Sequence, residues 1–143
     1  MIKILTVERN SRNGNGTAIC SFKEGAGTFR LNKIALQSLG LEHGNLINFS
    51  YDDEENRFYV FKSNTDGYKI RICNNGKEAI ASCIEVVRRI VEKYRLNVIT
   101  DAPSSHRKYI DTAPIQFIDQ DTGEQIAMFK IKLTEKESSP NLS

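Results

Sequence analysis

Residues 75–94 read Asn-Gly-Lys-Glu-Ala-Ile-Ala-Ser-Cys-Ile-Glu-Val-Val-Arg-Arg-Ile-Val-Glu-Lys-Tyr and carry the strongest secondary-structure signal in the chain. Asn75, followed by Glu78 three residues later, resembles the capping box that begins many helices. The stretch therefore predicts one long amphipathic helix over about 76–94, laid across a β-sheet. Its apolar side chains recur at the i, i+3, i+4, i+7 spacing of a single helical face, and they are Ile80, Cys83, Ile84, Val87, Ile90, Val91 and Tyr94.

Basic residues crowd the C-terminal half of this stretch, where positive charge suits the helix dipole. They are Arg88, Arg89, Lys93 and Arg95. One interpretation is a patch that faces phosphate. The other, which we favour, is a solvated face, because Glu85 and Glu92 lie three or four residues from the arginines and are placed to pair with them.

Outside this stretch, alternating apolar and polar residues predict a series of strands. A short helix is expected from Lys33 to Leu39, with Asn32 as its N-cap and Gly40 at its end. The fold class that this order predicts is α+β: mainly antiparallel β with one short helix (about 33–39) and one long amphipathic helix (about 76–94). The expected strands cover residues 2–8, 17–23, 47–51, 57–62, 68–73, 97–100, 115–118 and 126–133.

Composition sets the limits on function. The chain has 143 residues, of which 39% are hydrophobic and 27% charged, so it is expected to bury a core and is too short for a large enzyme. Its 20 Lys and Arg against 18 Asp and Glu give a net charge of +2, which indicates no strong overall attraction to polyanions. No apolar run approaches the length of a membrane span, and no secretory signal is recognised. We therefore expect a cytoplasmic protein that does not contact a membrane.

No pattern of catalytic or metal-binding residues emerges. Cys20, Cys73 and Cys83 lack the spacing of zinc ligands and are interpreted as reduced, structural thiols. The run Asp-Ala-Pro-Ser-Ser-His-Arg-Lys at 101–108 is interpreted as a polar loop rather than a nucleophilic triad. The run at 119–124 is interpreted as a hairpin turn rather than a calcium loop. We accordingly expect no enzyme activity, no metal and no cofactor.

One stretch carries a family resemblance. Residues 27–52 read Gly-Thr-Phe-Arg-Leu-Asn-Lys-Ile-Ala-Leu-Gln-Ser-Leu-Gly-Leu-Glu-His-Gly-Asn-Leu-Ile-Asn-Phe-Ser-Tyr-Asp, and a return strand continues through Lys62. A strand, a short helix closed by Leu-Gly-Leu, and a hairpin with an acidic turn follow one another. In this order the stretch resembles the AbrB-like family of swapped-hairpin transition-state regulators. The resemblance covers residues 27–62 only.

The resemblance implies a homodimer in which two chains interlock their hairpins into one barrel, and it implies DNA contact through basic residues of the N-terminal strands and hinge. The positions that match that role here are Lys23, Arg30, Lys33, Arg9 and Arg12. It also suggests a division into a swapped-hairpin-like β-rich region (1–63), a β-helix-β-hairpin region (64–133) and a disordered tail (134–143). No internal repeat is recognised in the sequence.

Two functions remain in view. The first is a small non-enzymatic DNA-binding or regulatory protein that contacts phosphates through its basic N-terminal hairpin region. The second is a structural or protein-interaction module of a phage or mobile-element assembly, without nucleic-acid binding. The apolar return strand at 57–62 is compatible with both, since an apolar residue on each face indicates either burial in a sandwich or a dimer interface.

Overall fold

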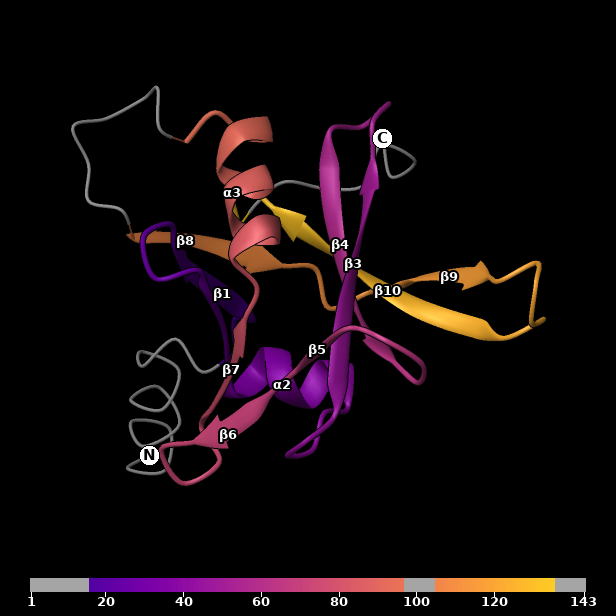
Figure 1. Cartoon of the computed structure of the whole chain (residues 1–143), viewed down its shortest axis with the longest axis horizontal. Helices are drawn as coiled ribbons and strands as arrows, with labels where there is room; N and C mark the ends of the chain where they lie inside the picture. Colours follow the sequence, from indigo (N-terminus) through magenta and orange to yellow (C-terminus); the bar gives the residue numbers. More distant parts are fainter. Residues whose placement is uncertain (1–15, 97–104, 136–143) are drawn as a thin grey trace, which may run out of the picture.

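The computed structural model describes residues 16–96 and 105–135 and shows a mainly antiparallel β-structure (Figure 1). Its helices are α2 (Lys33–Leu39) and α3 (Ile84–Lys93). Its strands are β1 (Ile19–Lys23), β2 (Thr28–Asn32), β3 (Leu46–Asp52), β4 (Arg57–Ser63), β5 (Tyr68–Lys69), β6 (Arg71–Cys73), β7 (Glu78–Ser82), β8 (Ser105–Ile110), β9 (Ile115–Ile118) and β10 (Gln125–Lys132). The strands expected at 2–8 and 97–100, and the tail from residue 136, lie outside the described residues.

The strands form one sheet that curls into a nearly closed barrel. Their hydrogen-bonded order is β5-β3-β4-β10-β8-β1-β2-β7-β6, and β9 lies off this path, paired with β10. The two outermost strands, β5 and β6, are consecutive in the chain and are separated only by Ile70. Ile70 is fastened to the loop after α2, because its N–H donates to the carbonyl of Asn45 at 2.9 Å and its carbonyl accepts from the N–H of Gly44 at 3.2 Å. The segment 68–73 therefore joins the two ends of the sheet.

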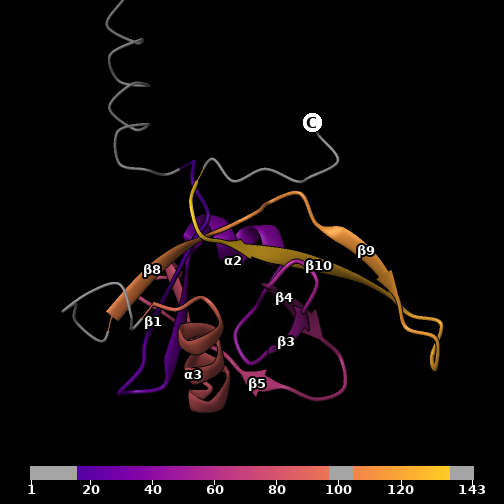
Figure 2. The same cartoon turned by 90° about the horizontal axis from the view of Figure 1, so that it is seen from above.

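The order and pairing of elements in the first half of the chain recur approximately in the second half, as if related by a two-fold axis, although the sequence shows no repeat. Each half contains a hairpin, a helix and a second hairpin: β1–β2, α2 and β3–β4 in the first half, and β6–β7, α3 and β8–β10 in the second. The halves interlock, since β1 pairs with β8, and β5 pairs with β3. The two halves also meet where β2 pairs with β7 and where β4 pairs with β10. In keeping with this two-fold pattern, α2 and α3 lie on opposite sides of the barrel (Figures 1 and 2).

The prediction of a long helix over about 76–94 is wrong, and with it the α+β fold class. Residues 78–82 form β7, which pairs with β2 on one side and β6 on the other, and the helix begins only at Ile84. Asn75 is not an N-cap: Asn74, Asn75 and Gly76 all have positive φ angles, of 54°, 59° and 82°, and make the β6–β7 turn. Asn-Gly is a strong hairpin signal. Tertiary pairing on both edges thus overrides the helical spacing of the apolar residues.

The short helix over 33–39 is observed with the predicted caps. The Asn32 Oδ1 atom accepts from the N–H of Ala35 at 3.0 Å, and Gly40 closes the helix with a φ of 68°. The same Asn32 side chain also joins β1, because Oδ1 accepts from the N–H of Ile19 at 3.1 Å and Nδ2 donates to the carbonyl of Thr17 at 2.8 Å. One amide therefore caps α2 and continues the β1–β2 ladder.

The polar loop expected at 101–108 is also partly wrong, because residues 105–110 form β8 between β1 and β10. The hairpin turn expected at 119–124 is confirmed: Gly123 has a φ of 75°, and the N–H of Asp119 donates to the carbonyl of Glu124 at 2.8 Å. No helix among the described residues is both long and apolar enough to cross a membrane.

The β3–β4 hairpin buries both of its faces within the single chain. Phe58, Tyr59 and Val60 are consecutive in β4 and are 4%, 6% and 0% exposed, although alternate residues of a strand point to opposite faces. The partners come from the second half of the chain, through pairing with β10 and ring contacts with α3. Of the two explanations for the apolar return strand, burial within the fold is the one observed.

The Tyr94 hydroxyl, at the end of α3, holds the place where the barrel strands separate. β10 pairs with β4 at Phe129 and Lys130 and then turns to pair with β8. By register, the next pair across β4 and β10 is Phe58 and Ile131. The hydroxyl lies between these two, accepting from the N–H of Phe58 at 2.8 Å and donating to the carbonyl of Ile131 at 2.8 Å. It replaces the missing ladder contact and satisfies two buried backbone groups.

Replacing Tyr94 with Phe is expected to destabilise the fold while keeping the ring. The change leaves a buried N–H and a buried carbonyl without their partner, and each such group costs about 1–3 kcal/mol. Urea unfolding followed by circular dichroism measures the effect. Tyr68→Phe is the matched control, because the Tyr68 side chain is half-buried and its hydroxyl forms no hydrogen bond with the described residues. Equal stability of the two variants would contradict this role for Tyr94.

Candidate nucleic-acid interface

The structure separates the five basic residues that the resemblance singled out. Lys23 and Arg30 lie on the outer face of the barrel, on β1 and β2, because they alternate with the buried Phe22, Phe29 and Leu31. Lys33 is exposed and begins α2, beyond the end of β2. Arg9 and Arg12 lie outside the described residues. Two of the five therefore share one surface.

Register places further basic residues on that surface. Directly paired residues of neighbouring strands share a face of the sheet. One row of pairs runs from β8 to β6 and places three arginines in line, with Ser21 and Ile80 between them. Its members, in order, are Arg107, Ser21, Arg30, Ile80 and Arg71. We name the set formed by Lys23, Arg30, Arg71, Lys77 and Arg107 the basic face.

A shallow depression of about 260 Å³ lies within the basic face. Arg30, Lys77 and Arg107 line it together with polar groups of β1 and β2. Glu78 is the acidic residue of its lining, and its carboxylate pairs with the Arg30 guanidinium. The second carboxylate oxygen of Glu78 accepts from the Asn74 side-chain amide at 2.8 Å. Arg30 is therefore held in place by an internal anion, while its side chain stays 40% exposed.

The sequence did not identify Arg71, Lys77 or Arg107 as site residues. Arg107 was assigned to a polar loop, although Ser105, Arg107 and Tyr109 alternate with His106, Lys108 and Ile110 as in a strand. Arg71 was recognised on a strand, opposite to the apolar residues. What the sequence did not show is which strands are neighbours, and that alone brings Arg71, Arg30 and Arg107 into one row.

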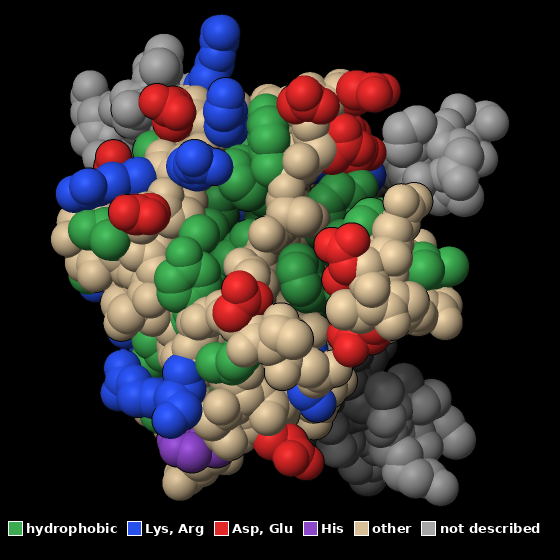
Figure 3. Space-filling model, turned by 45° about the vertical axis from the view of Figure 1, so that its right-hand side comes forward, with side chains coloured by type: hydrophobic (Ala, Val, Ile, Leu, Met, Phe, Trp, Pro, Cys, Tyr) green, Lys and Arg blue, Asp and Glu red, His purple; other side chains and the backbone are tan. Residues whose placement is uncertain are grey.

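The face of the molecule seen in Figure 3 is mixed in charge. Figure 3 shows hydrophobic side chains in the middle of the face that contains β3 and β4, basic side chains in groups along the left, and acidic side chains densest at the upper right. The tip of the β3–β4 hairpin contributes Asp52, Asp53 and Glu54, all exposed. Arg88 and Arg89 of α3 are exposed, and within the described residues neither forms an ion pair with Glu85 or Glu92. Positive and negative side chains thus occur together on this face.

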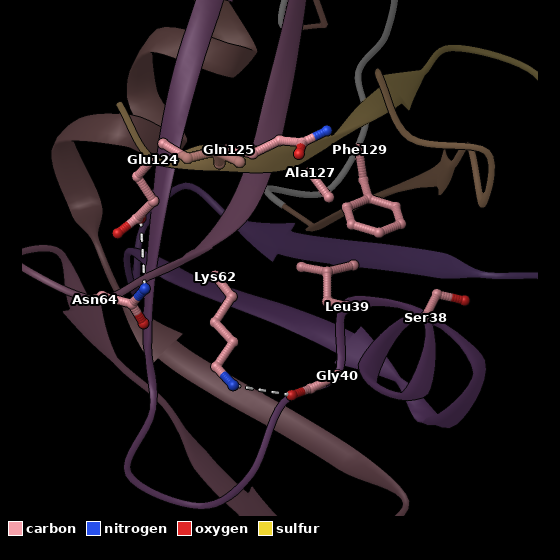
Figure 4. A pocket seen from close by; sticks show the side chains of 10 residues that line it. Ser38, Leu39, Gly40, Lys62, Asn64, Glu124, Gln125, Ala127 and Phe129 are labelled. Carbon is pink, nitrogen blue, oxygen red and sulfur yellow. Dashed lines mark hydrogen bonds between the residues drawn. The ribbon is translucent and has the colours of Figure 1, made fainter. Parts of the chain in front are cut away.

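A second depression, of about 320 Å³, lies between α2, β4 and β10 (Figure 4). Leu39 and Phe129 form its apolar part. Its polar groups bind one another: the Lys62 amine contacts the carbonyl of Gly40 at 3.5 Å, and the Asn64 amide contacts the Glu124 carboxylate at 3.4 Å. A neighbouring depression near β9 is lined by similar groups. In this neighbouring depression the Thr65 hydroxyl donates to the Asp66 carboxylate at 3.2 Å, and both side chains are exposed.

One cluster of titratable groups bridges β4, its turn and β10. The Glu55 carboxylate accepts from the Tyr59 hydroxyl at 2.7 Å and pairs with the buried Lys130 amine. Burial opposes ionisation of Glu55, but these two hydrogen bonds outweigh it, and the pKa of Glu55 lies below its usual value. Burial and the neighbouring Glu55 raise the pKa of Tyr59. These residues line none of the three depressions, and the pair joins the β3–β4 turn to β10.

Burial shifts the ionisation of two thiols and one imidazole. Burial raises the pKa of Cys20 to about 12 and that of Cys83 to about 12, so both thiols stay protonated at neutral pH. His106 contacts the ring of Phe22 with centroids 5.7 Å apart, and burial lowers its pKa. In the described part of the chain, no group of three or more His, Cys, Asp or Glu is placed to hold a metal ion.

Comparison with known proteins gives no relative from which a function is transferred. No family model matches the sequence, and neither the curated proteins nor the solved structures contain a match.

The Glu55–Lys130 pair is expected to make stability depend on pH in the acid range. A carboxyl whose pKa is lowered by folding stabilises the fold above its unfolded pKa, and this stabilisation is lost as the pH falls through the folded pKa. Glu55→Gln is expected to lower the free energy of unfolding at pH 7 by about 1–3 kcal/mol. The difference from the parent protein then shrinks as the pH falls below about 4. Urea unfolding at pH 7, 5 and 3 measures it.

Glu54→Gln provides the control, because Glu54 lies in the same turn and its side chain is exposed. It is expected to change stability little at any of the three pH values. A Glu55→Gln variant that loses the same stability at pH 3 as at pH 7 would show that the carboxylate charge is not what stabilises this corner.

Proposed function

We propose that this chain is a small, non-enzymatic DNA-binding protein that contacts phosphates through its basic face. The observation that carries the proposal is the register row in which Arg107, Arg30 and Arg71 alternate with two uncharged residues across five strands. Arginine side chains suit phosphate, because the planar guanidinium binds its oxygens in a bidentate manner. The same role agrees with a cytoplasmic protein whose cysteines are reduced.

The row has dimensions that suit a duplex. Neighbouring strands lie about 4.8 Å apart, so successive arginines are separated by roughly 10 Å at their backbones and the row spans up to roughly 19 Å. Ten ångströms is close to the rise of about three nucleotides along one strand of DNA. Because the β-strands fix these separations, the protein backbone needs little further ordering when the basic face binds the regularly spaced phosphates of DNA.

The expected binding is modest and independent of base sequence. Phosphate contacts position a protein on DNA but do not read bases, and operator binders with strong salt dependence make about six to ten of them. The basic face provides five cationic side chains, and Glu78 already occupies Arg30. About four contacts predict a slope of roughly −3.6 in a plot of log K against log salt.

The family resemblance supports the same surface. It assigns DNA contact to Lys23 and Arg30, which are both members of the basic face. It also implies that a second hairpin unit completes the barrel; here the second half of the same chain provides β7 for β2 and β10 for β4. In the proposed protein a single chain thus presents one basic face.

A protein-interaction module is the second candidate. The observation that favours it is a group of exposed large hydrophobic residues on β9, where Ile115, Phe117 and Ile118 are 48%, 47% and 62% exposed. Apolar side chains gathered on one strand are typical of surfaces that contact other proteins. The two functions are compatible, because β9 contributes no residue to the basic face.

The double variant Arg71→Ala, Arg107→Ala is expected to weaken binding to all duplexes about equally. It should also lower the magnitude of the salt slope by roughly two, since each lost phosphate contact removes close to one released counterion. Fluorescence anisotropy with unrelated duplexes at several salt concentrations measures both. Arg88→Ala with Arg89→Ala removes the same charge from α3 and serves as the control, with little change expected. Equal losses in the two double variants would refute the assignment.

Glu78→Gln is expected to act in the opposite direction and to strengthen DNA binding. The substitution removes the carboxylate that occupies Arg30 and lowers the negative charge of the basic face by one. The salt slope is expected to become steeper by about one, because Arg30 then has phosphate as its anionic partner. Titration of the same duplexes checks this. Weaker binding by Glu78→Gln, with the fold intact by circular dichroism, would show that Arg30 does not contact DNA.

A further inference from the structure

The β9–β10 arm ends in a strand with an open edge. β9 pairs with β10 alone among the described strands, over Ile115–Met128 to Ile118–Gln125. The arm projects away from the barrel in both views (Figures 1 and 2). All four side chains of β9, Ile-Gln-Phe-Ile, are exposed. This strand therefore lies outside the core that buries the rest of the apolar residues.

The direction of the backbone groups on β9 follows from one hydrogen bond. The N–H of Asp119 points toward β10, where it donates to the carbonyl of Glu124 at 2.8 Å. Backbone groups alternate from one side of a strand to the other, so those of Phe117 and Ile115 also face β10. Those of Gln116 and Ile118 face the open edge. The arm thus presents two N–H groups and two carbonyls, all available to another strand.

This edge lacks the protection that natural sheets give to their edges. Proteins usually place lysine or another charge on an edge strand to prevent pairing with a second chain. β9 has no charged residue, and large apolar side chains point to both of its faces. Of the four large hydrophobic residues most exposed in the described structure, three are on β9. Such an edge is a template for strand addition.

We propose that β9 pairs antiparallel with β9 of a second copy of this chain, giving a two-fold dimer through a four-stranded β10-β9-β9-β10 sheet. A two-fold axis perpendicular to the sheet relates the two strands. The open edge then permits three registers, with Gln116, Phe117 or Ile118 opposite its own symmetry mate, and the last needs backbone groups of Gln120, which lies in the β9–β10 turn. In the first, the next bonded pair requires an N–H from residue 114, which is proline and has none.

The register centred on Phe117 uses every group on the open edge. The backbone of Gln116 in each copy exchanges two hydrogen bonds with that of Ile118 in the other copy, which makes four hydrogen bonds in total. None of them requires an N–H from Pro114. Phe117 then faces its symmetry mate at a non-hydrogen-bonded position, where side chains are closest and aromatic pairs stabilise. Asp119, the first charged residue after the strand, lies opposite Ile115, so no two carboxylates meet. The edge is complementary to itself in hydrogen bonding, shape and charge.

This dimer differs from the one that the family resemblance implies. There, the hairpins of residues 17–63 interlock between chains, whereas here their partners are β7, β8 and β10 of the same chain. The interface on β9 leaves the basic face free in each copy. Dimerisation through β9 does not depend on DNA binding, and both experiments that test it are carried out without DNA.

Sedimentation velocity over a range of protein concentrations provides the first test. The parent protein is expected to dimerise, and Phe117→Lys is expected to be monomeric, since it places two positive charges face to face at the axis. Thr122→Lys adds the same charge at the exposed turn of the arm and is expected to remain dimeric. A parent protein that is monomeric at about 100 μM, a concentration that detects even weak association, would overturn the proposal. So would a dimer that Phe117→Lys leaves intact.

Cysteine crosslinking tests the register. In a Cys73→Ser background, which removes the native thiol that is not buried, Phe117→Cys is expected to form an intermolecular disulfide under mild oxidation. Non-hydrogen-bonded pairs have Cα atoms about 4.5 Å apart, within the range that a disulfide spans. Ile115→Cys lies opposite Asp119 and is expected not to crosslink. Crosslinking of Ile115→Cys as fast as that of Phe117→Cys would overturn the register, and crosslinking of neither would overturn the β9 interface.

Discussion

The contact on which the barrel depends is the insertion of one phenol between two strands. β4 and β10 are in register at Val60–Phe129 and Tyr59–Lys130, and continued pairing would hold β10 against β4. The Tyr94 hydroxyl takes the next position, between Phe58 and Ile131, so that β10 bends away to meet β8 without leaving either group unsatisfied. β8 pairs with β1, and β1 pairs with β2. The position of the basic face therefore depends on this bend in β10.

The two-fold pattern explains how so small a chain covers its strands. A single hairpin with two apolar faces needs cover on both, and each half of the chain provides it for the other. The symmetry concerns pairing rather than chemistry: β2 and β7 lie 50 residues apart in sequence, and the position of Arg30 in β2 is matched by Ile80 in β7. The basic face therefore does not follow the two-fold pattern of the strand pairing.

What the sequence predicted correctly was local, and what it missed depended on pairing between distant segments. The caps at Asn32 and Gly40, the acidic turn after β3 and the turn at Gly123 each follow from the conformations that a few adjacent residues allow. The helix over 76–94 failed because Ala79 to Ser82 satisfy a strand as well as a helix, and β2 and β6 decide between them. Asn74-Asn75-Gly76 carried the turn signal that would have ended the helix earlier.

The same reasoning explains the partial prediction of the site. Lys23 and Arg30 were proposed because a local stretch resembles a known family, and the structure places both on the basic face. Arg107 and Arg71 were not, because their proximity to Arg30 exists only once β8 is beside β1 and β6 is beside β7.

The interlocking of the halves also governs how the protein is made. During synthesis, β1 emerges more than 80 residues before β8, and β4 more than 60 residues before β10. Each strand of the first half has its hairpin partner early, but the second neighbours of β1, β2 and β4 are β8, β7 and β10, which leave the ribosome only with the second half. Folding of this chain is therefore a late event dominated by non-local contacts, which makes it slow, and β3–β4 must pass through a period with its apolar faces uncovered. The nascent chain is the form of this molecule that most needs a chaperone.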